Sequence, residues 1–371
     1  MLAHVRKPLS ELLRAPLTHA LATRLASPRR VDDYLELVDR CWSLDEIRAR
    51  VIEIRRETRN VTSLWLQPNE NWRGHRAGQH VQLTVSVEGV RRTRCFSLSN
   101  APAQNGALRL TIKTHDQGCV SRFTHEAARV GDVVTLSAAQ GSFVLPDGVP
   151  SKLLFVSGGS GLTPLVAMAQ QLACTGYRGS LTWLHSERGE VPLLDELRTL
   201  ARELPSMQLH VHRTATTLPN GTRARHLSSD QLAQLVPDWQ QREAFVCGPR
   251  GLMSTVKALF AARGLSEHVH SESFQPEWPA AAPIRSLKAR LVFAKSGVQS
   301  EASAGVSLLE QAEQAGLRPL HGCRMGICHT CVCTKLSGSV RNELTGVTSD
   351  ARDEEIQLCI HTPLSDVRLD L

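Results

Sequence analysis

The feature that most constrains this 371-residue chain is a group of three cysteines near its C-terminus, followed by a fourth. The segment reads Cys323-Arg-Met-Gly-Ile-Cys328-His-Thr-Cys331, and Cys359 lies further along. Cys-x4-Cys-x2-Cys with one distant cysteine is the plant-type spacing for a 2Fe–2S cluster, in which one loop supplies three thiolates. A four-cysteine zinc site is the alternative, but such sites usually show two Cys-x2-Cys pairs. We expect these four cysteines to be cluster ligands.

Composition limits the remaining classes of protein. The chain length suggests two or three domains, the hydrophobic fraction of 42% suffices for packed cores, and no apolar run is long enough to span a membrane. Ten cysteines without a secretory signal favour the cytoplasm over a disulfide framework. Residues 1–30 hold six basic residues against one acidic residue, but no nucleic-acid-binding motif accompanies them. Nucleic acid is therefore not an expected partner.

The residue pattern predicts three folded domains after an N-terminal extension. Residues 1–47 are leucine-rich and helix-like, whereas short alternating runs in 48–150 predict an antiparallel β-barrel. Strands alternating with helices in 151–276 predict a doubly wound parallel α/β sheet. Residues 277–286 form a proline- and alanine-rich linker, and 287–371 carry a hairpin, a short helix and the cysteine loop. The expected class is multidomain α+β.

Two short motifs fall in the predicted barrel. In Arg94-Cys-Phe96-Ser97 at a strand end, alternation places Arg94 and Phe96 on one face, where they could pair a phosphate and stack on a flat ring. An ordinary strand is the alternative. Gly118-Cys-Val-Ser121 precedes a helix expected to start near Arg122, and a helix N-terminus can bind a pyrophosphate. A plain serine cap is the alternative there.

Two further motifs fall in the predicted parallel sheet. Gly158-Gly-Ser-Gly-Leu-Thr163-Pro164 follows a buried strand, and we expect Thr163 to be the N-cap of a helix with Pro164 at its first position. This glycine loop suits a second pyrophosphate. Cys247-Gly-Pro249 ends a later strand, at the carboxyl edge where ligands of such sheets bind.

The order of these motifs resembles the ferredoxin–NADP reductase superfamily, and the C-terminal part resembles plant-type ferredoxin, a β-grasp fold. The resemblance covers about residues 48–371. Over this range the chain is similar to the three-domain reductases of oxygenases and desaturases. It implies a barrel that binds flavin, an α/β domain that binds NAD(P)H, and a ferredoxin domain. FAD is favoured over FMN because the glycine segment at residue 118 and Lys113 suit a pyrophosphate and an adenosine.

The resemblance also implies roles for individual residues. The residues expected to contact FAD, from its phosphate to its N5 and adenosine, are Arg94, Phe96, Ser97, Leu98, Thr111, Ile112, Lys113, Gly118, Val120 and Ser121. Those expected to contact the nicotinamide dinucleotide are Gly158, Gly159, Gly161, Thr163, Pro164, Arg213, Cys247, Gly248 and Pro249. The residues expected at the point of hydride transfer are Ser97, Cys247, Glu272 and Phe274. The family usually has tyrosine where Phe96 stands, so one hydroxyl bond to the flavin is missing.

The choice between NADPH and NADH depends on a few arginines. Arg213 follows the strand whose end faces the adenosine ribose, and with Arg223 or Arg225 it could pair a 2′-phosphate bidentately. This favours NADPH. The alternative, with NADH as the donor, is that these arginines are solvated loop residues.

The implied function is electron transfer from NAD(P)H through FAD to the cluster, because a flavin links a two-electron donor to a one-electron acceptor. The expected acceptor is an oxygen-activating iron enzyme, first of all a membrane acyl-CoA desaturase. Basic and leucine-rich residues 1–30 would then contact the inner face of the membrane. The alternatives are the reductase of a soluble aromatic-ring or other mono- or dioxygenase and, in another class, a redox-sensing binding protein. We expect a cytoplasmic monomer.

Overall fold

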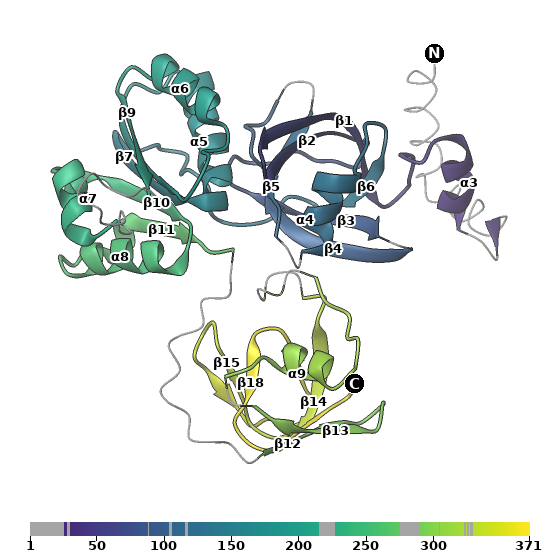
Figure 1. Ribbon diagram of the computed structural model, residues 1–371. Coiled ribbons are helices and arrows are strands. Elements are labelled where there is room, and N and C mark those ends of the chain that lie inside the picture. The colour runs from purple at the N-terminus through teal and green to yellow at the C-terminus, as the bar shows by residue number, and fades with distance from the viewer. Residues whose placement is uncertain are drawn as a thin grey trace. The chain divides into compact units, whose positions relative to one another are not determined.

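The computed structural model of the chain describes residues 26–27, 30–87, 89–103, 106–115, 118–214, 227–274, 289–303, 305–322, 324, 326 and 329–371. It forms two compact units, Met1–Glu272 and Ser273–Leu371 (Figure 1). Most of the expected N-terminal extension and the whole linker 277–286 lie outside the described residues. No helix in the described part of the chain is long and apolar enough to cross a bilayer.

The first unit begins with a helix and an antiparallel barrel. Helix α3 spans Val31–Val38, and the barrel strands are β1 (Ile47–Thr58), β2 (Val61–Pro68), β3 (His80–Val87), β4 (Val90–Ser97), β5 (Leu108–Lys113) and β6 (Val133–Leu136). Their order is β4-β3-β6-β1-β2-β5, and a bridge between Leu98 and Leu110 joins the two outermost strands. Leu64, Leu83 and Leu110 are fully buried inside. The predicted antiparallel barrel is thus confirmed.

The helix at the glycine segment begins earlier than predicted. Helix α4 spans Cys119–Arg122 with Gly118 as its N-cap and continues into a π-helical turn, η1 (Phe123–Ala127). Ser121 therefore lies inside the helix, where its Oγ donates to the Gly118 carbonyl (3.1 Å) and accepts from the His115 N–H (3.2 Å). The expected start near Arg122 was wrong because Ser121 bonds back to the turn instead of capping a new helix.

The second part of the unit is a parallel sheet with helices on both faces (Figure 1). The strands, in the order β11-β10-β7-β8-β9, are β7 (Lys152–Gly158), β8 (Ser180–Glu187), β9 (Met207–Arg213), β10 (Glu243–Cys247) and β11 (Val269–Glu272). The helices are α5 (Leu162–Cys174), α6 (Leu194–Glu203), α7 (Ser229–Leu235) and α8 (Arg250–Ala261), with short 3-10 turns η2 (Gly159–Gly161), η3 (Trp239–Gln241) and η4 (Ser266–His268). This confirms the predicted doubly wound sheet.

Helix α5 differs from the prediction at its first residues. Gly161 is the N-cap and Leu162 the first helical residue, because the 3-10 turn η2 runs directly into the helix. Thr163 is therefore not the cap. Its hydroxyl instead donates to the Ser160 carbonyl at 3.0 Å, which fastens the glycine turn to the helix.

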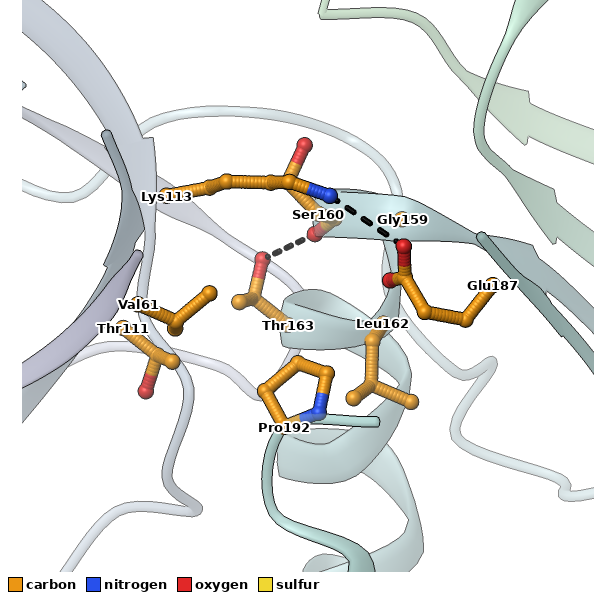
Figure 2. A pocket seen from close by; sticks show the side chains of 9 residues that line it. All are labelled: Val61, Thr111, Lys113, Gly159, Ser160, Leu162, Thr163, Glu187 and Pro192. Atoms are coloured by element: carbon orange, nitrogen blue, oxygen red, sulfur yellow. Dashed lines mark hydrogen bonds and ion pairs between the residues drawn. The ribbon is translucent and has the colours of Figure 1, made fainter. Parts of the chain in front are cut away.

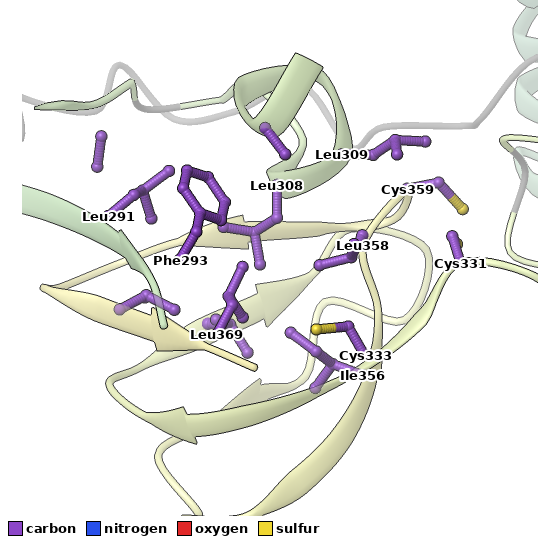
Figure 3. Packing of buried hydrophobic residues seen from close by; sticks show 14 of the residues in the cluster. Leu291, Phe293, Leu308, Leu309, Cys331, Cys333, Ile356, Leu358, Cys359 and Leu369 are labelled. Carbon is purple, nitrogen blue, oxygen red and sulfur yellow. The ribbon is translucent and has the colours of Figure 1, made fainter. Parts of the chain in front are cut away.

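The described residues of the second unit form a mixed five-stranded sheet, a smaller three-stranded sheet and one helix. Its elements are β12 (Ala289–Phe293), β13 (Val298–Ala302), α9 (Leu308–Gln314), β14 (Val332–Ser337), β15 (Val340–Asn342), β16 (Thr348–Ser349), β17 (Glu354–Gln357), β18 (His361–Pro363) and β19 (Val367–Leu369). The main sheet has the order β13-β12-β19-β14-β17. Leu308 and Leu309 of α9 pack on its core with Phe293 and Leu369 (Figure 3). This is the predicted ferredoxin-like domain.

Candidate functional site

Two of the residues expected at the point of hydride transfer lie at the carboxyl ends of neighbouring parallel strands. Cys247 is the last residue of β10, and its register partners are Ser157 on β7 and Glu272 on β11. Because adjacent parallel strands end at one edge of the sheet, the Cys247 thiol and the Glu272 carboxylate are brought together there. This edge is where the sequence predicted the ligand.

The Glu272 carboxylate also contacts the barrel. The Ser97 hydroxyl donates to Oε2 of Glu272 at 3.4 Å, and Nδ1 of His80 lies 3.3 Å from Oε1. Ser97 and His80 are register partners on β4 and β3, and both are buried. The structure therefore brings Ser97, Cys247 and Glu272 together. His80 was not among the predicted residues.

The Cys247 thiol has an unusual electrostatic environment. Burial raises its pKa well above the ordinary value, and the nearby charge of Glu272 raises it further. Cys247 thus stays protonated at neutral pH, and a protonated thiol is a poor nucleophile. Its place in the site is that of a small neutral packing group and weak donor.

The two glycine loops at this edge touch backbone to backbone. A Cβ added to Gly161 would clash with the Cys247 carbonyl oxygen, and one added to Gly248 would lie 2.8 Å from the Gly158 nitrogen. A Cβ on Gly158 would lie 2.7 Å from the Pro249 ring. Only glycine fits at these positions, because any side chain would force the two loops apart. Because these loops lack side chains at the glycines, a dinucleotide could approach their backbone closely.

A cleft lies between the barrel strands β2 and β5 and the turn that follows β7 (Figure 2). Its lining residues are Val61, Thr111, Lys113, Gly159, Ser160, Leu162, Thr163, Glu187 and Pro192. Residues predicted for the flavin, Thr111 and Lys113, thus face residues predicted for the nicotinamide nucleotide, Gly159 and Thr163. The structure brings the two predicted sets together at one cleft.

Two ion pairs join the barrel to the parallel sheet. Lys113 Nζ lies 3.2 Å from Glu187 Oε1, and Figure 2 shows these side chains meeting at the cleft. Arg109 pairs bidentately with Glu196 of α6, at 2.6 and 2.8 Å, and lies over the Trp65 ring. Arg109 is buried, so this pair is shielded from solvent and its geometry holds the two domains in register.

Several predicted flavin contacts are not made by exposed side chains. Leu98, Ile112 and Val120 lie in the hydrophobic core of the barrel. The Thr111 hydroxyl is hydrogen bonded to Ser63 and Ser99, at 2.9 and 2.8 Å. A flavin contact from Leu98, Ile112 or Val120 would have to come from the main chain, whereas Thr111 also lines the cleft.

A buried polar chain runs beneath the cleft. The Trp183 indole donates to Ser157 Oγ (2.8 Å), which is hydrogen bonded to His185 Nδ1 (2.8 Å). His185 Nε2 lies 4.0 Å from Glu187 Oε2. Burial lowers the pKa of His185 to about 4, although the Glu187 charge opposes this shift. His185 is therefore a neutral imidazole at physiological pH.

The cluster site lies in the second unit, and half of its expected ligands are described. The Leu358 N–H donates to the Cys331 carbonyl at 3.0 Å, which sets Cys331 beside Cys359 (Figure 3). Both cysteines are buried. Cys323 and Cys328 lie outside the described residues, and no three potential metal ligands gather among those that are described. The pairing of Cys331 with Cys359 from two separate segments fits a cluster held by a loop and a distant cysteine.

The structure also offers features that fit the two organic cofactors. Nε2 of His80 is buried beside Ser97 and has no hydrogen-bond partner among the described residues. A buried polar atom of this kind is normally satisfied by a bound group or a water. Together with the glycine loops at residues 158–161 and 247–249, it fits a flavin beside Ser97 and a dinucleotide over the sheet edge.

Three family models match the chain. An oxidoreductase FAD-binding domain matches residues 48–145, an oxidoreductase NAD-binding domain matches 155–258, and a 2Fe-2S iron-sulfur cluster binding domain matches 292–364. Their order is that of the barrel, the parallel sheet and the small mixed sheet.

Relatives match over nearly the whole chain. An NADPH oxidoreductase of Mycobacterium tuberculosis is 33% identical over 368 residues, 96% of this chain and 94% of the relative. A glycine betaine monooxygenase reductase subunit of Chromohalobacter salexigens is 27% identical and covers 89% of this chain and 96% of its own. The solved structure of phthalate dioxygenase reductase is 25% identical, with a TM-score of 0.59 over 88% of this chain and 98% of that one.

The site and these similarities agree on the cofactors. The chain binds FAD, a 2Fe–2S cluster and NAD(P)H, one for each of its three domains. It therefore belongs to the family of ferredoxin–NADP reductase-type oxidoreductases with a C-terminal 2Fe–2S ferredoxin domain, and it carries electrons from NAD(P)H through FAD to its iron–sulfur cluster.

Proposed function

We propose that this reductase supplies electrons to the oxygen-activating iron component of a mono- or dioxygenase. The proposal rests on the similarity of this chain to phthalate dioxygenase reductase, which extends over 98% of the length of that reductase. Relatives named as a glycine betaine monooxygenase reductase subunit and as the ferredoxin reductase component of 3-ketosteroid-9-alpha-monooxygenase support it. The acyl-CoA desaturase expected from residues 1–30 has less support, because that segment lies almost wholly outside the described residues and the relatives above are not named for desaturation.

The acceptor is tested by reconstitution. The purified reductase is mixed with NADPH and either an iron oxygenase component of the phthalate dioxygenase or glycine betaine monooxygenase type, or an acyl-CoA desaturase in phospholipid vesicles. We expect coupled product formation with an oxygenase component and little with the desaturase. Product formed only by the desaturase, and more slowly after deletion of residues 1–25, would reverse the proposal.

For the hydride step, we propose roles for the chain's own residues. Ser97 would donate a hydrogen bond at the reactive nitrogen of the flavin, Glu272 would orient that hydroxyl, and Cys247 would pack beside the nicotinamide as a neutral thiol. Phe274, which follows β11 by two residues, would cover the flavin ring. When bound, the flavin accepts a hydride and releases single electrons, which connects the nucleotide to the cluster. The support is the contact of Ser97 with Glu272 and the register of Glu272 with Cys247.

We also propose that NADPH is the preferred donor. Arg213 is exposed at the carboxyl end of β9, at the sheet edge where the dinucleotide is expected, and one relative is named an NADPH oxidoreductase. Arg213→Ala should raise the KM for NADPH about tenfold or more, equivalent to about 1.4 kcal/mol, and leave the KM for NADH nearly unchanged. Arg263→Ala, at an exposed arginine just beyond α8, is the matched control. Equal effects of Arg213→Ala on both nucleotides would show that Arg213 does not contact the 2′-phosphate.

A further inference from the structure

His80 is a buried polar residue to which the sequence assigned no role. It begins β3, is only 5% exposed, and lies opposite Ser97 in the barrel sheet. Its Nδ1 lies 3.3 Å from Oε1 of Glu272, whereas Oε2 of the same carboxylate accepts from Ser97. One carboxylate is thus held by two neighbouring barrel residues, one at each oxygen.

The imidazole ring of His80 is fixed by the backbone around it. His80 and Gln140 exchange two backbone hydrogen bonds of 2.9 Å, which place residue 141 directly against the ring. Gly141 has a φ of +106°, and a Cβ added there would lie 2.9 Å from His80 Nδ1 and 3.9 Å from Glu272 Oε1. Only glycine leaves room for the contact between His80 and Glu272. The site is therefore built around this contact.

The charged groups near the His80 ring determine which of its two nitrogens donates a hydrogen bond. Among the described residues, the charged group in contact with the His80 side chain is the Glu272 carboxylate, and Ser97 and Gln140 on the adjoining segments are uncharged. Cys247, opposite Glu272, is kept protonated. A carboxylate only accepts hydrogen bonds, so Nδ1 carries the proton in this contact and Nε2, which has no partner among the described residues, is left for a bound group or water.

We propose that His80 is a positioning residue for hydride transfer: its Nδ1–H holds Glu272 so that the other carboxylate oxygen fixes the Ser97 hydroxyl. The inference rests on the roles proposed above for Ser97 and Glu272. Reactions at a preorganised site are sensitive to displacements of about 1 Å, so loss of this anchor should slow the hydride step more than it weakens nucleotide binding.

The test compares three substitutions of His80 in the FAD-loaded protein. In His80→Asn the amide nitrogen takes the place of Nδ1, in His80→Gln it falls nearer the place of Nε2, and His80→Leu removes the donor. Anaerobic stopped-flow mixing with NADPH follows flavin bleaching. We expect the limiting rate to fall about tenfold or more in His80→Leu and His80→Gln, with the Kd for NADPH changed less than about twofold. His80→Asn should restore most of the lost rate.

A second readout is independent of turnover. Crystal structures of the variants should show the distance from Ser97 Oγ to the Glu272 carboxylate exceeding hydrogen-bonding range in His80→Leu and returning in His80→Asn. If Ser97→Ala slows bleaching tenfold while His80→Leu and His80→Gln do not, the inference is overturned and the proposed site stands. If Ser97→Ala and Glu272→Gln leave bleaching unchanged, the proposed site falls, and the role of His80 with it. Should His80→Leu fail to fold, the contrast between the Asn and Gln variants decides.

Discussion

Cys247 in the first unit and Cys331 in the second are both buried cysteines, yet their surroundings suit them to opposite chemistry. Cys247 ends a strand between two others, faces a carboxylate and keeps its proton because burial raises its pKa. Cys331 precedes β14 and is bonded through its carbonyl to the segment that carries Cys359. A single thiol against a negative charge remains neutral, whereas thiols converging from two segments can share a metal centre as thiolates. Burial alone does not predict which role a cysteine has.

Cys333 lies only two residues from Cys331, but its surroundings resemble those of Cys247. Its Sγ lies 3.7 Å from the Thr334 carbonyl oxygen, beside Ile356 in the core (Figure 3). Burial, followed by the Asp370 charge, raises its pKa. Cys333 is thus a packing residue, as the sequence predicted when it assigned the ligands to residues 323, 328, 331 and 359.

Substitution of Cys331 and of Cys333 should have opposite consequences for the iron–sulfur cluster. Cys331→Ser should abolish the absorbance of the cluster and the reduction of cytochrome c, while ferricyanide reduction, which can draw on the flavin directly, persists. Cys333→Ser, the matched control, should keep the cluster because it changes only core packing. The measurements are the visible spectrum and the two reductase assays. A Cys333→Ser protein without a cluster, beside a Cys331→Ser protein that retains it, would invalidate the ligand assignment.

The second prediction concerns His185 in the first unit, where burial makes the stability of the protein depend on pH. Because the pKa of His185 falls from 6.5 to about 4 in the folded protein, the unfolded chain binds a proton in that interval and the folded protein does not. The contribution of His185 to the free energy of unfolding is therefore fully present above about pH 6.5. The free energy of unfolding should fall by about 3 kcal/mol as the pH drops to about 4.

Urea unfolding followed by tryptophan fluorescence measures this dependence. His185→Asn cannot be protonated in the same range, so its unfolding midpoint should lose a large part of the decline between about pH 6.5 and 4. The variant should also be less stable than the parent at pH 7, because the bond to Ser157 changes. Parallel pH curves for the two proteins would show that His185 is not the source of the decline.

The smallest effect concerns the reactivity of thiols in the first unit. At pH 8, Cys247 should react with iodoacetamide about tenfold or more slowly than the exposed Cys174, because Cys247 is buried and its pKa is raised. Mass spectrometry of the folded, FAD-loaded protein gives the rates, and urea-unfolded protein should label both equally. Comparable rates in the folded protein would show that neither burial nor a raised pKa protects the Cys247 thiol.

Much of the fold was predictable from local sequence pattern. Strands β3 and β5 fall on alternating runs within the predicted barrel, and a capping serine marks the start of α7 within the predicted α/β domain. Contacts between distant segments were not predictable. His80 pairs with Glu272 192 residues away, and Arg109 pairs with Glu196 across the domain junction. The starts of α4 and α5 were misplaced because glycines, which carry no side-chain signal, cap both helices.

The most direct test of the account is an anaerobic NADPH titration of the parent protein and Cys331→Ser, followed by absorbance and by the electron paramagnetic resonance of the reduced cluster. In the parent, flavin bleaching should be accompanied by the cluster signal, and the protein should reduce cytochrome c. In Cys331→Ser the flavin should bleach to the same extent with no cluster signal and no cytochrome c reduction. A variant that lacks the cluster but still reduces cytochrome c at the parental rate would contradict the path from NAD(P)H through FAD to the cluster.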